Sequence, residues 1–362
     1  MRLIVTGGGT GGHVFPALEV ARLARQEGWD VLYLGSNRGQ ERRSCQLAGI
    51  PFQGFPSEPL YSFKSPRGWK AGINLARSSA MARGAVKKAK PHAVFSTGGY
   101  SSAPVVMAAR GLKIPLVIHE QNSVPGRTNL WAAKKASYIA TTFHSSNAHF
   151  EAGKAVRTGM PVREELRRQA AARHLMIDAS PLKILVTGGS QGSAALNEAS
   201  IATAARMTAL DLRWTHVTGR THFEKIFPTY EKLGIGKIYE MKSFLEGAAM
   251  GEALADASIV VGRSGAGTLS ELAAFRIPSV LVPLPTAFAN HQLHNAEEFE
   301  QMGAAVIVAQ DVLHPSTLQN ALTGWIEDPD RRDRAQSALE DWDCPDAARN
   351  ILDLVQKAAK RE

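Results

Sequence analysis

Four glycine-rich turns are the parts of this sequence best suited to chemistry. They span Gly7–Gly12, Gly98–Tyr100, Gly188–Gly192 and Gly262–Gly267. A glycine turn between a strand and a helix points backbone N–H groups and the positive end of the helix at an anion. The alternative is that the glycines serve only to pack helices closely against strands. Four such turns in one chain favour several bound anions, or one anion bound from two sides.

The first turn also has the G-x-G-x-x-G spacing of dinucleotide-binding folds, at Gly7, Gly9 and Gly12. Those folds need an acidic residue at the end of the second strand, where it binds the ribose. Here that strand ends at Tyr33–Asn37 without Asp or Glu, and no glycine run continues as Gly-Lys-Ser/Thr. A dinucleotide is therefore disfavoured, and a P-loop is excluded.

The turns belong to a unit that occurs twice. Leu3–Gly12 reads LIVTGGGTGG and Ile184–Ser193 reads ILVTGGSQGS, each an apolar strand followed by a glycine turn and a helical run. Further short apolar strands follow each copy, near Val31–Leu34, Ala93–Ser96, Leu116–His119, Ser137–Ala140, Leu212–Val217, Ile238–Met241, Ile259–Val261, Ser279–Val282 and Ala304–Val308. Continuous apolar strands separated by helices predict parallel sheets that are buried on both faces.

We therefore predict an α/β fold with two doubly wound, Rossmann-like domains that face each other across a cleft. The predicted domains are residues 1–162 and 163–340, and the charged stretch Arg163–Ser180 is expected to link them. Residues 341–362 are expected to form a helix that packs back on the first domain. A chain of 362 residues is long enough for two such cores.

Composition excludes several classes of protein. With 44% apolar and 21% charged residues, the chain is neither fibrous nor mostly disordered. Its sequence contains no apolar run of about 18 residues, the length that suggests a membrane span. Its first residues also lack the apolar core of a signal peptide. Cys45 and Cys344 have no neighbouring cysteines, which excludes a disulfide scaffold or a cysteine zinc cluster and fits a reducing cytoplasm.

Charge is distributed unevenly along the chain. Residues 1–162 carry 21 Lys/Arg and 7 Asp/Glu, a net +14, whereas residues 163–362 carry 21 and 26, a net −5. The 61 residues between Glu58 and Glu120 contain ten basic residues and no acidic one. Such a half suits a polyanion or an anionic membrane, or is simply a solvated basic face. Nucleic acid is disfavoured, since the sequence lacks a recognisable nucleic-acid module and interleaved aromatic residues.

Seven motifs appear in order and together resemble one family. They are Gly8–His13, Gly98–Ser101, His119–Asn122, Gly159–Arg163, Gly188–Gly192, Arg263–Glu271 and Asn290–Gln292. From residue 1 to about residue 350 the chain is similar to the bacterial glycosyltransferases of family 28, which have the two-domain GT-B fold. These enzymes add N-acetylglucosamine to lipid-linked muramyl pentapeptide in peptidoglycan synthesis. The alternative is another GT-B nucleotide-sugar transferase that acts on a glycolipid.

The resemblance implies that the donor, UDP-N-acetylglucosamine (UDP-GlcNAc), binds mainly at the strand ends of the second domain. Glu271 matches the carboxylate that binds the ribose, although Thr268–Glu271 also has the pattern of a helix capping box. Ser190 would hold the diphosphate, and Arg163 would contact the nucleotide sugar. The resemblance also marks as donor-binding Thr10, Gly11, Gly12, Ala266, Gly267, Thr268, Leu269 and Ser270.

Three more positions are implied for the base and the sugar of the donor. The backbone at Leu245 would read the uracil edge. Asn122 and Gln292 match groups that hold the sugar hydroxyls, and an amide suits that task because it both donates and accepts hydrogen bonds.

The implied reaction is displacement at the anomeric carbon of the donor by the 4-hydroxyl of muramic acid, with inversion of configuration. Glycine-turn amides, helix ends and Arg163 would stabilise the departing UDP. Because these groups can act without a metal, neither a metal nor another cofactor is expected. His13, directly after the first turn, is the candidate general base, with His119 and Glu120 as alternatives.

The acceptor lipid diphosphate would meet Gly11 and Gly12 together with Gly98, Gly99 and Tyr100. Because this acceptor is anionic and lies in the inner leaflet, the resemblance implies a peripheral protein on the cytoplasmic face of the bacterial inner membrane. The segment Tyr61–Lys70, continued through Ile73 and Leu75, mixes bases with apolar residues as membrane contact requires. Within it, Phe63 and Trp69 fit a protein core equally well.

Overall fold

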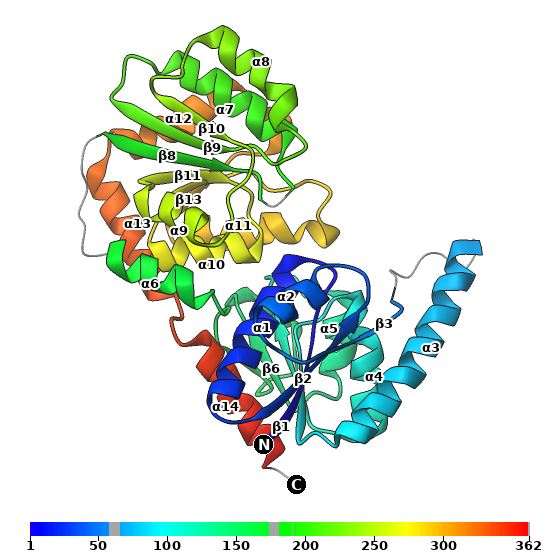
Figure 1. Ribbon diagram of the computed structural model, residues 1–362. Helices are drawn as coiled ribbons and strands as arrows, with labels where there is room; N and C mark the ends of the chain where they lie inside the picture. The colour runs from blue at the N-terminus through cyan, green and yellow to red at the C-terminus, as the bar shows by residue number, and fades with distance from the viewer. Residues whose placement is uncertain (58–65, 174–180, 190, 361–362) are drawn as a thin grey trace. The chain divides into compact units, whose positions relative to one another are not determined.

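The computed structural model describes residues 1–57, 66–173, 181–189 and 191–360, with only the backbone for residues 66–71. The chain forms two compact units, one of Met1–Arg163 with Cys344–Glu362 and the other of Glu164–Asp343. Each unit is a parallel sheet with helices on both faces, as Figure 1 shows. The predicted α/β class with two doubly wound domains is confirmed.

In the first unit, the described strands form one seven-stranded parallel sheet in the order β3-β2-β1-β4-β5-β6-β7. Their bounds are β1 Arg2–Thr6, β2 Asp30–Ser36, β3 Phe52–Phe55, β4 Ala93–Ser96, β5 Leu116–Glu120, β6 Tyr138–Thr141 and β7 Ala155–Arg157. The predicted strands of this unit are present within two residues of their expected ends. The edge strands β3 and β7 were not predicted, because they are short, partly exposed and lack a continuous apolar run.

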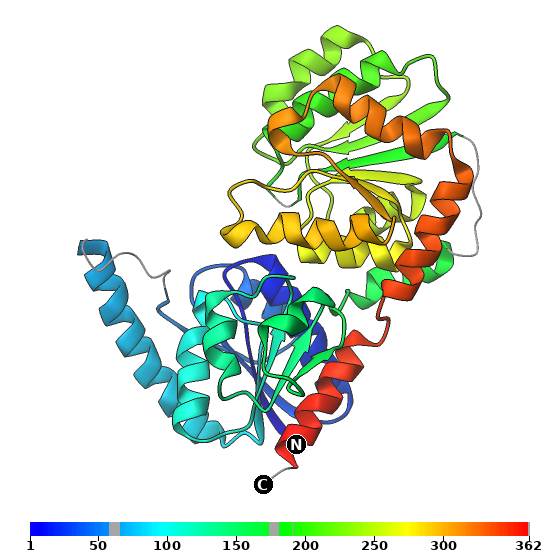
Figure 2. The same cartoon turned by 180° about the vertical axis from the view of Figure 1, so that it is seen from behind.

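Two helical layers bury the two faces of this sheet. One layer contains α1 (Gly11–Gln26), α2 (Glu41–Leu47) and α14 (Ala347–Ala359), and the other contains α3 (Pro66–Ala89), α4 (Ala103–Gly111) and α5 (Arg127–Ala133). Leu3 and Val5 of β1 pack in the first core, whereas Ile4 between them packs in the second. Figure 1 shows α14 beside α1, and Figure 2 shows α3 and α4 from the other side. Burial on both faces explains why β1 is apolar at successive positions.

In the second unit, the described strands form a six-stranded parallel sheet in the order β10-β9-β8-β11-β12-β13. Their bounds are β8 Leu182–Thr187, β9 Leu212–Val217, β10 Tyr239–Lys242, β11 Ile259–Gly262, β12 Ser279–Leu281 and β13 Ala305–Ile307. One face carries α7 (Ala194–Arg206), α8 (Phe223–Leu233) and α12 (Pro315–Ile326) (Figure 1). The other side carries α6 (Glu164–Arg173), α9 (Gly247–Asp256), α10 (Ala266–Phe275), α11 (His291–Gln301) and α13 (Pro329–Trp342).

Most of the stretch predicted as a linker, Arg163–Ser180, belongs to the second unit instead. Residues 164–173 form α6, which buries Leu166 and Ala170 on one helical face. Arg173 at its end donates hydrogen bonds to the carbonyls of Ala255, Phe275 and Ala257 at 2.7–3.1 Å. The linker prediction was therefore wrong for these residues, because a high charge content concealed the apolar pair four residues apart.

Both sheets have a topological switch point, where adjacent strands continue into helices on opposite faces. In the first unit it lies between β1 and β4, and in the second between β8 and β11. Open parallel sheets bind ligands in the crevice outside the carboxyl ends of such strands. The four glycine turns follow these four strands directly, so each pair of turns lies at a switch point.

Candidate active site

The two glycine turns of the first unit lie against each other. Gly8 N donates to Gly98 O at 3.3 Å, and Thr97 Oγ1 donates to His13 O at 2.7 Å. A Cβ on Gly99 would lie 2.1 Å from Gly8 O, and Gly99 has φ +83°. Only glycine fits that position, because a side chain would both clash with backbone and be strained. Close packing thus accounts for part of the glycine pattern.

An acid from α2 supports the first turn from beneath. Glu41 is fully buried, and Gly9 N donates to its Oε1 at 3.2 Å. The hydroxyl of Tyr33 donates to Gly7 O, and burial raises the pKa of that tyrosine well above its usual value. The sequence analysis missed Glu41, which lies four residues beyond the segment where a ribose-binding acid was sought. Its carboxyl group thus occupies the Gly9 end of the turn.

The other end of the turn, at Gly11 and Gly12, is the start of α1. Thr10 is the N-cap residue but makes no side-chain capping hydrogen bond, and the first helical turn contains no acidic residue. Thr10 and Gly12 are exposed, and His13 is half-buried. Phe15 belongs to α1, and the Arg163 guanidinium lies 5.5 Å from the centroid of its ring. The structure therefore brings Thr10, Gly11, Gly12, His13 and Arg163 together, with Arg163 as the last residue of the first unit.

His13 is bonded to the segment that follows β5. Its Nδ1 lies 2.9 Å from Oε1 of Gln121, a side chain that is 2% exposed. Gln121 belongs to the His119–Asn122 motif, but the sequence analysis gave it no role. The ring of Tyr100 packs on the same turn, since a Cβ on Gly9 would lie 2.8 Å from Tyr100 Cε1. The residues proposed for the acceptor, Gly98–Tyr100, thus lie beside the histidine turn.

The alternative bases, His119 and Glu120, are enclosed within the unit. His119 is fully buried and contacts Gly159 O through Nε2 at 3.0 Å, and desolvation lowers its pKa to about 4. The Glu120 carboxylate accepts from Asn122 N at 2.9 Å, Gly126 N at 3.1 Å and Asn129 Nδ2 at 2.8 Å. Burial raises the pKa of Glu120, and these hydrogen bonds oppose the rise. Both residues order the loop that carries Asn122, and neither is placed to meet a substrate hydroxyl.

In the second unit, a buried arginine joins the strand ends. Arg263 is 9% exposed and donates to the carbonyls of Val282 and Pro283 at 2.9 and 3.1 Å. It also donates to Ser193 Oγ at 2.7 Å and to Gln310 Oε1 at 2.6 Å. All four acceptors are neutral, so they leave the positive charge uncompensated, and burial lowers the pKa of the guanidinium. The sequence analysis gave Arg263 no role, although a basic residue directly after β11 could have indicated an anion-binding residue.

The helices that start near Arg263 differ in how they are capped. Ser193 Oγ caps α7 by accepting from Leu196 N at 3.4 Å. In contrast, α10 begins after Gly265 with no side-chain cap and no acidic residue in its first turn. Unpaired N–H groups at such a start attract a phosphate. Ser190, the residue expected to hold the diphosphate, lies outside the described residues.

The residues of the Arg263–Glu271 motif divide by burial. Ala266, Leu269 and Ser270 are buried, so their side chains face the interior of the unit. Gly267, Thr268 and Glu271 are half-buried. The capping-box interpretation of Thr268–Glu271 was wrong, because the helix begins three residues earlier than that pattern requires. Glu271 therefore lies in the second turn of α10 and not at its third position, where a capping-box acid would lie.

Gln292 and Leu245 complete the second half of the site. Gln292 lies in the first turn of α11, where its Oε1 accepts from Leu284 N at 3.0 Å and its carbonyl accepts from Ser264 Oγ at 2.7 Å. It is therefore joined to the turn that carries Arg263. Leu245 lies in the loop between β10 and α9 and shares no described hydrogen bond with these residues. Thr10–Gly12, Asn122 and Arg163 belong to the other unit.

Two doubly wound parallel-sheet units, each with glycine turns at its switch point, form the two-domain GT-B fold of nucleotide-sugar enzymes. The model of the glycosyltransferase family 28 N-terminal domain matches residues 3–141, and that of the C-terminal domain matches residues 183–351. The chain belongs to glycosyltransferase family 28.

Individual relatives match almost the whole chain. A protein of Lactococcus lactis named UDP-N-acetylglucosamine--N-acetylmuramyl-(pentapeptide) pyrophosphoryl-undecaprenol N-acetylglucosamine transferase is 33% identical over 99% of this chain and 100% of its own. A protein of the same name from Desulforudis audaxviator is 36% identical over 99% of both chains. The crystal structure of Acinetobacter baumannii MurG superposes with a TM-score of 0.79 at 30% identity, covering 98% of this chain and 99% of that one.

Proposed function

We propose that this chain transfers N-acetylglucosamine from UDP-GlcNAc to the 4-hydroxyl of undecaprenyl-diphospho-muramyl pentapeptide, with inversion at the anomeric carbon. The observation that carries the proposal is the full-length similarity to relatives named for this transfer, at 33–36% identity. The residues grouped in each unit support the proposal. In the first unit, His13 lies at the start of α1 and can act as a base. In the second unit, Arg263 and the start of α10 provide positive charge for a diphosphate.

In the second unit, α10 and Arg263 hold the UDP diphosphate. A helix start is equivalent to about half a positive charge, and the Arg263 guanidinium adds a charge that its four acceptors do not neutralise. Both favour the anion, and both favour it more as the bond from the anomeric carbon to UDP breaks and negative charge collects on the diphosphate. Glu271 accepts from the ribose hydroxyls, and Gln292 and Asn122 hold the sugar.

In the first unit, His13 removes the proton from the attacking hydroxyl. The oxygen of that hydroxyl forms the new bond to the anomeric carbon on the face opposite UDP, so configuration inverts. The proton passes to the imidazole, and UDP departs with the electron pair of the broken bond. The start of α1 at Gly11 and Gly12, together with Gly98–Tyr100, binds the acceptor diphosphate.

Incubation with radiolabelled UDP-GlcNAc and muramyl-pentapeptide lipid tests this function directly. Label is expected in the lipid phase, and a β-N-acetylglucosaminidase is expected to release the labelled sugar from the lipid product. A protein that leaves this lipid unlabelled but transfers label to a different glycolipid would belong to another branch of the two-domain transferases.

Replacing Glu271 by Ala is expected to raise the Michaelis constant for UDP-GlcNAc. A hydrogen bond to a charged group contributes about 1.5–3 kcal/mol, so the loss corresponds to roughly tenfold to a hundredfold. Calorimetric titration with UDP measures the same loss without turnover. The matched control is Glu252→Ala on the exposed side of α9, and unchanged UDP affinity in the Glu271 variant would remove this residue from the ribose site.

We also propose that the outer surface of α3, α4 and α5 contacts the anionic membrane in which the acceptor lies, on the cytoplasmic face of the inner membrane. Five large apolar side chains of this layer are 40–67% exposed, namely Ile73, Met81, Met107, Leu130 and Trp131. Arg77 and Arg83 lie on the same helices. The expected contact residues Phe63, Trp69 and Lys70 have no described side chains. No described helix is both long enough and apolar enough to cross a bilayer.

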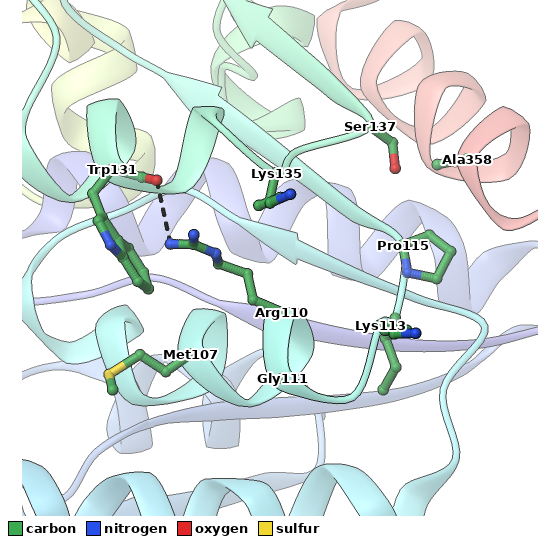
Figure 3. A pocket seen from close by; sticks show the side chains of 10 residues that line it. Met107, Arg110, Gly111, Lys113, Pro115, Trp131, Lys135, Ser137 and Ala358 are labelled. Atoms are coloured by element: carbon green, nitrogen blue, oxygen red, sulfur yellow. Dashed lines mark hydrogen bonds between the residues drawn. The ribbon is translucent and has the colours of Figure 1, made fainter.

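A basic hollow of about 730 Å³ lies in the same layer, as Figure 3 shows. Arg110, Lys113 and Lys135 line it, and the Arg110 guanidinium lies 4.0 Å from the ring centroid of Trp131. Because Pro115 precedes β5 and Ser137 precedes β6, the hollow lies at the amino-terminal edge of the sheet. It is therefore separate from the candidate active site and fits the membrane-facing charge of this unit.

The double variant Ile73→Ser, Trp131→Ser is expected to bind anionic vesicles about tenfold or more weakly, because each large apolar side chain contributes roughly 1.5–3 kcal/mol when it is buried. Activity on a water-soluble acceptor analogue should remain. Vesicle sedimentation measures the first effect, and Leu47→Ser, an 82% exposed leucine on the opposite helical layer, is the matched control. Equal losses in vesicle binding and in soluble activity would mean damage to the core.

A further inference from the structure

We propose that Gln121 is a positioning residue that selects the tautomer of His13, so that Nε2 of the ring carries the lone pair that accepts the proton. This inference rests on the proposed role of His13 as the base. The bond from His13 Nδ1 to Gln121 Oε1, at 2.9 Å, is the contact through which Gln121 acts. It joins the first glycine turn to the buried end of β5.

The orientation of the Gln121 amide follows from its other neighbours. Its Nε2 lies 2.9 Å from Thr97 O and 3.0 Å from His119 O. Backbone carbonyls only accept hydrogen bonds, so the nitrogen end of the amide must face them. The opposite orientation would bring three oxygens together at hydrogen-bond distance without a proton between them. The oxygen end of the amide therefore faces His13.

A second histidine continues the same chain of hydrogen bonds. His119 Nε2 lies 3.0 Å from Gly159 O, which can only accept, so this nitrogen carries the proton. Desolvation lowers the pKa of His119 to about 4, so the ring is neutral and its Nδ1 is an acceptor that faces Gln121 Nε2 at 3.1 Å. Because Nε2 of Gln121 carries two hydrogens, this Nδ1 and the carbonyl of His119 share one of them, and Thr97 O accepts the other. Gly159 is itself held in place, since Thr158 N and Gly159 N both donate to Thr141 O. The direction of every bond in the chain is thus set by fixed carbonyls.

The consequence for His13 is a single tautomer. Because Gln121 Oε1 can only accept, Nδ1 of His13 must carry a proton, and in the neutral ring the lone pair then lies on Nε2. When Nε2 takes the proton of the attacking hydroxyl, the Nδ1–H donor becomes part of a cation, and its bond to Oε1 strengthens. An amide gives this support without adding a negative charge. A carboxylate in the same place would add one.

The tautomer is measurable in the resting protein. In ¹⁵N-histidine NMR spectra above the pKa of the ring, the His13 signals, assigned by their absence in His13→Ala, should report a protonated Nδ1 and an unprotonated Nε2. In Gln121→Met, which keeps the side-chain volume, the His13 signals should shift toward a mixture of tautomers. A protonated Nε2 in the unmodified protein would overturn the proposal, whatever the variant does.

A double-mutant cycle tests whether Gln121 acts through His13. Gln121→Met should lower turnover by roughly tenfold to a hundredfold, a part of the ~10²–10⁴-fold that a positioned base supplies. The Michaelis constant for UDP-GlcNAc should stay the same. In a His13→Ala background the same change should cost almost nothing further, because the residue through which it acts is gone. Equal losses in both backgrounds would show a general structural role and overturn the proposal.

The two measurements separate this inference from the proposed function. If the tautomer is as expected but His13→Ala leaves turnover intact, the positioning stands and the base assignment fails. If the unmodified protein labels no lipid, the transferase proposal fails, while the NMR spectra still decide what Gln121 does. Gln46→Leu on the exposed face of α2 is the matched control for both experiments.

Discussion

His13→Ala is expected to lower turnover by ~10²–10⁴-fold, the contribution of a positioned general base. The physical reason is that the attacking hydroxyl of a sugar holds its proton tightly near neutral pH, and the His13 ring lies at the start of α1, where it can accept that proton. The Michaelis constant for UDP-GlcNAc should change little, because Arg263 and α10, which are proposed to hold the diphosphate, lie in the other unit. Steady-state kinetics with a soluble acceptor analogue measures both quantities.

The pH profile gives this prediction a second readout. Turnover of the unmodified protein should fall as the pH is lowered, because a protonated imidazole cannot accept the proton of the attacking hydroxyl. In His13→Ala this decline should disappear along with most of the activity. His149→Ala, an exposed histidine of the same unit, is the matched control. Turnover close to normal in a folded His13→Ala protein would pass the role to another residue.

Arg263→Met is expected to cost both stability and donor binding. Methionine approximates the length of the side chain but removes every donor, so two carbonyls, Ser193 Oγ and Gln310 Oε1 each lose one hydrogen bond. Because one hydrogen bond to a charged group contributes about 1.5–3 kcal/mol, the free energy of unfolding should fall by about 3 kcal/mol or more. UDP affinity should fall at least about tenfold, since each 1.4 kcal/mol is a factor of ten.

A second variant separates the two effects of Arg263. Arg263→Lys keeps the charge, but one ammonium group lacks the planar fork that reaches four acceptors. It should therefore lose stability while keeping more UDP affinity than the methionine variant. Urea unfolding and calorimetry with UDP measure the two quantities, and Arg168→Met on the exposed side of α6 is the control. If Arg263→Met folds and binds UDP normally, Arg263 has no part in donor binding.

Local patterns predicted the architecture because the strands of both sheets are buried on both faces. Leu3, Ile4 and Val5 point alternately into two cores, which requires an unbroken apolar run of a kind that sequence displays directly. The duplicated strand–turn–helix unit also indicated that a glycine turn follows β1 and β8 without a gap, and the strand order then places both strands at switch points. The same reasoning failed at β3 and β7, which are short, partly exposed and lack a continuous apolar run.

Position in the sequence also predicted at which strand ends candidate site residues lie, because the carboxyl ends of parallel strands meet at one edge of a sheet, whereas the resemblance supplied their individual roles. His13, Gly98–Tyr100 and the Arg263–Glu271 motif all follow strands directly. The capping-box interpretation of Thr268–Glu271 was wrong because a helix start depends on the backbone after β11. Four residues match that pattern, but the chain had already turned into a helix at Ala266.

The sequence by itself determined the class of fold, the two repeated units and the strand ends at which the chemistry is expected. Only the tertiary structure decided which side chains support those turns: Glu41 beneath Gly9, Gln121 behind His13, and Arg263 across to Ser193. These partners lie 32, 108 and 70 positions apart in the chain. Periodicity tells which face of an element a side chain occupies, but not which distant residue it meets there. That pairing depends on strand order and on the packing of whole layers.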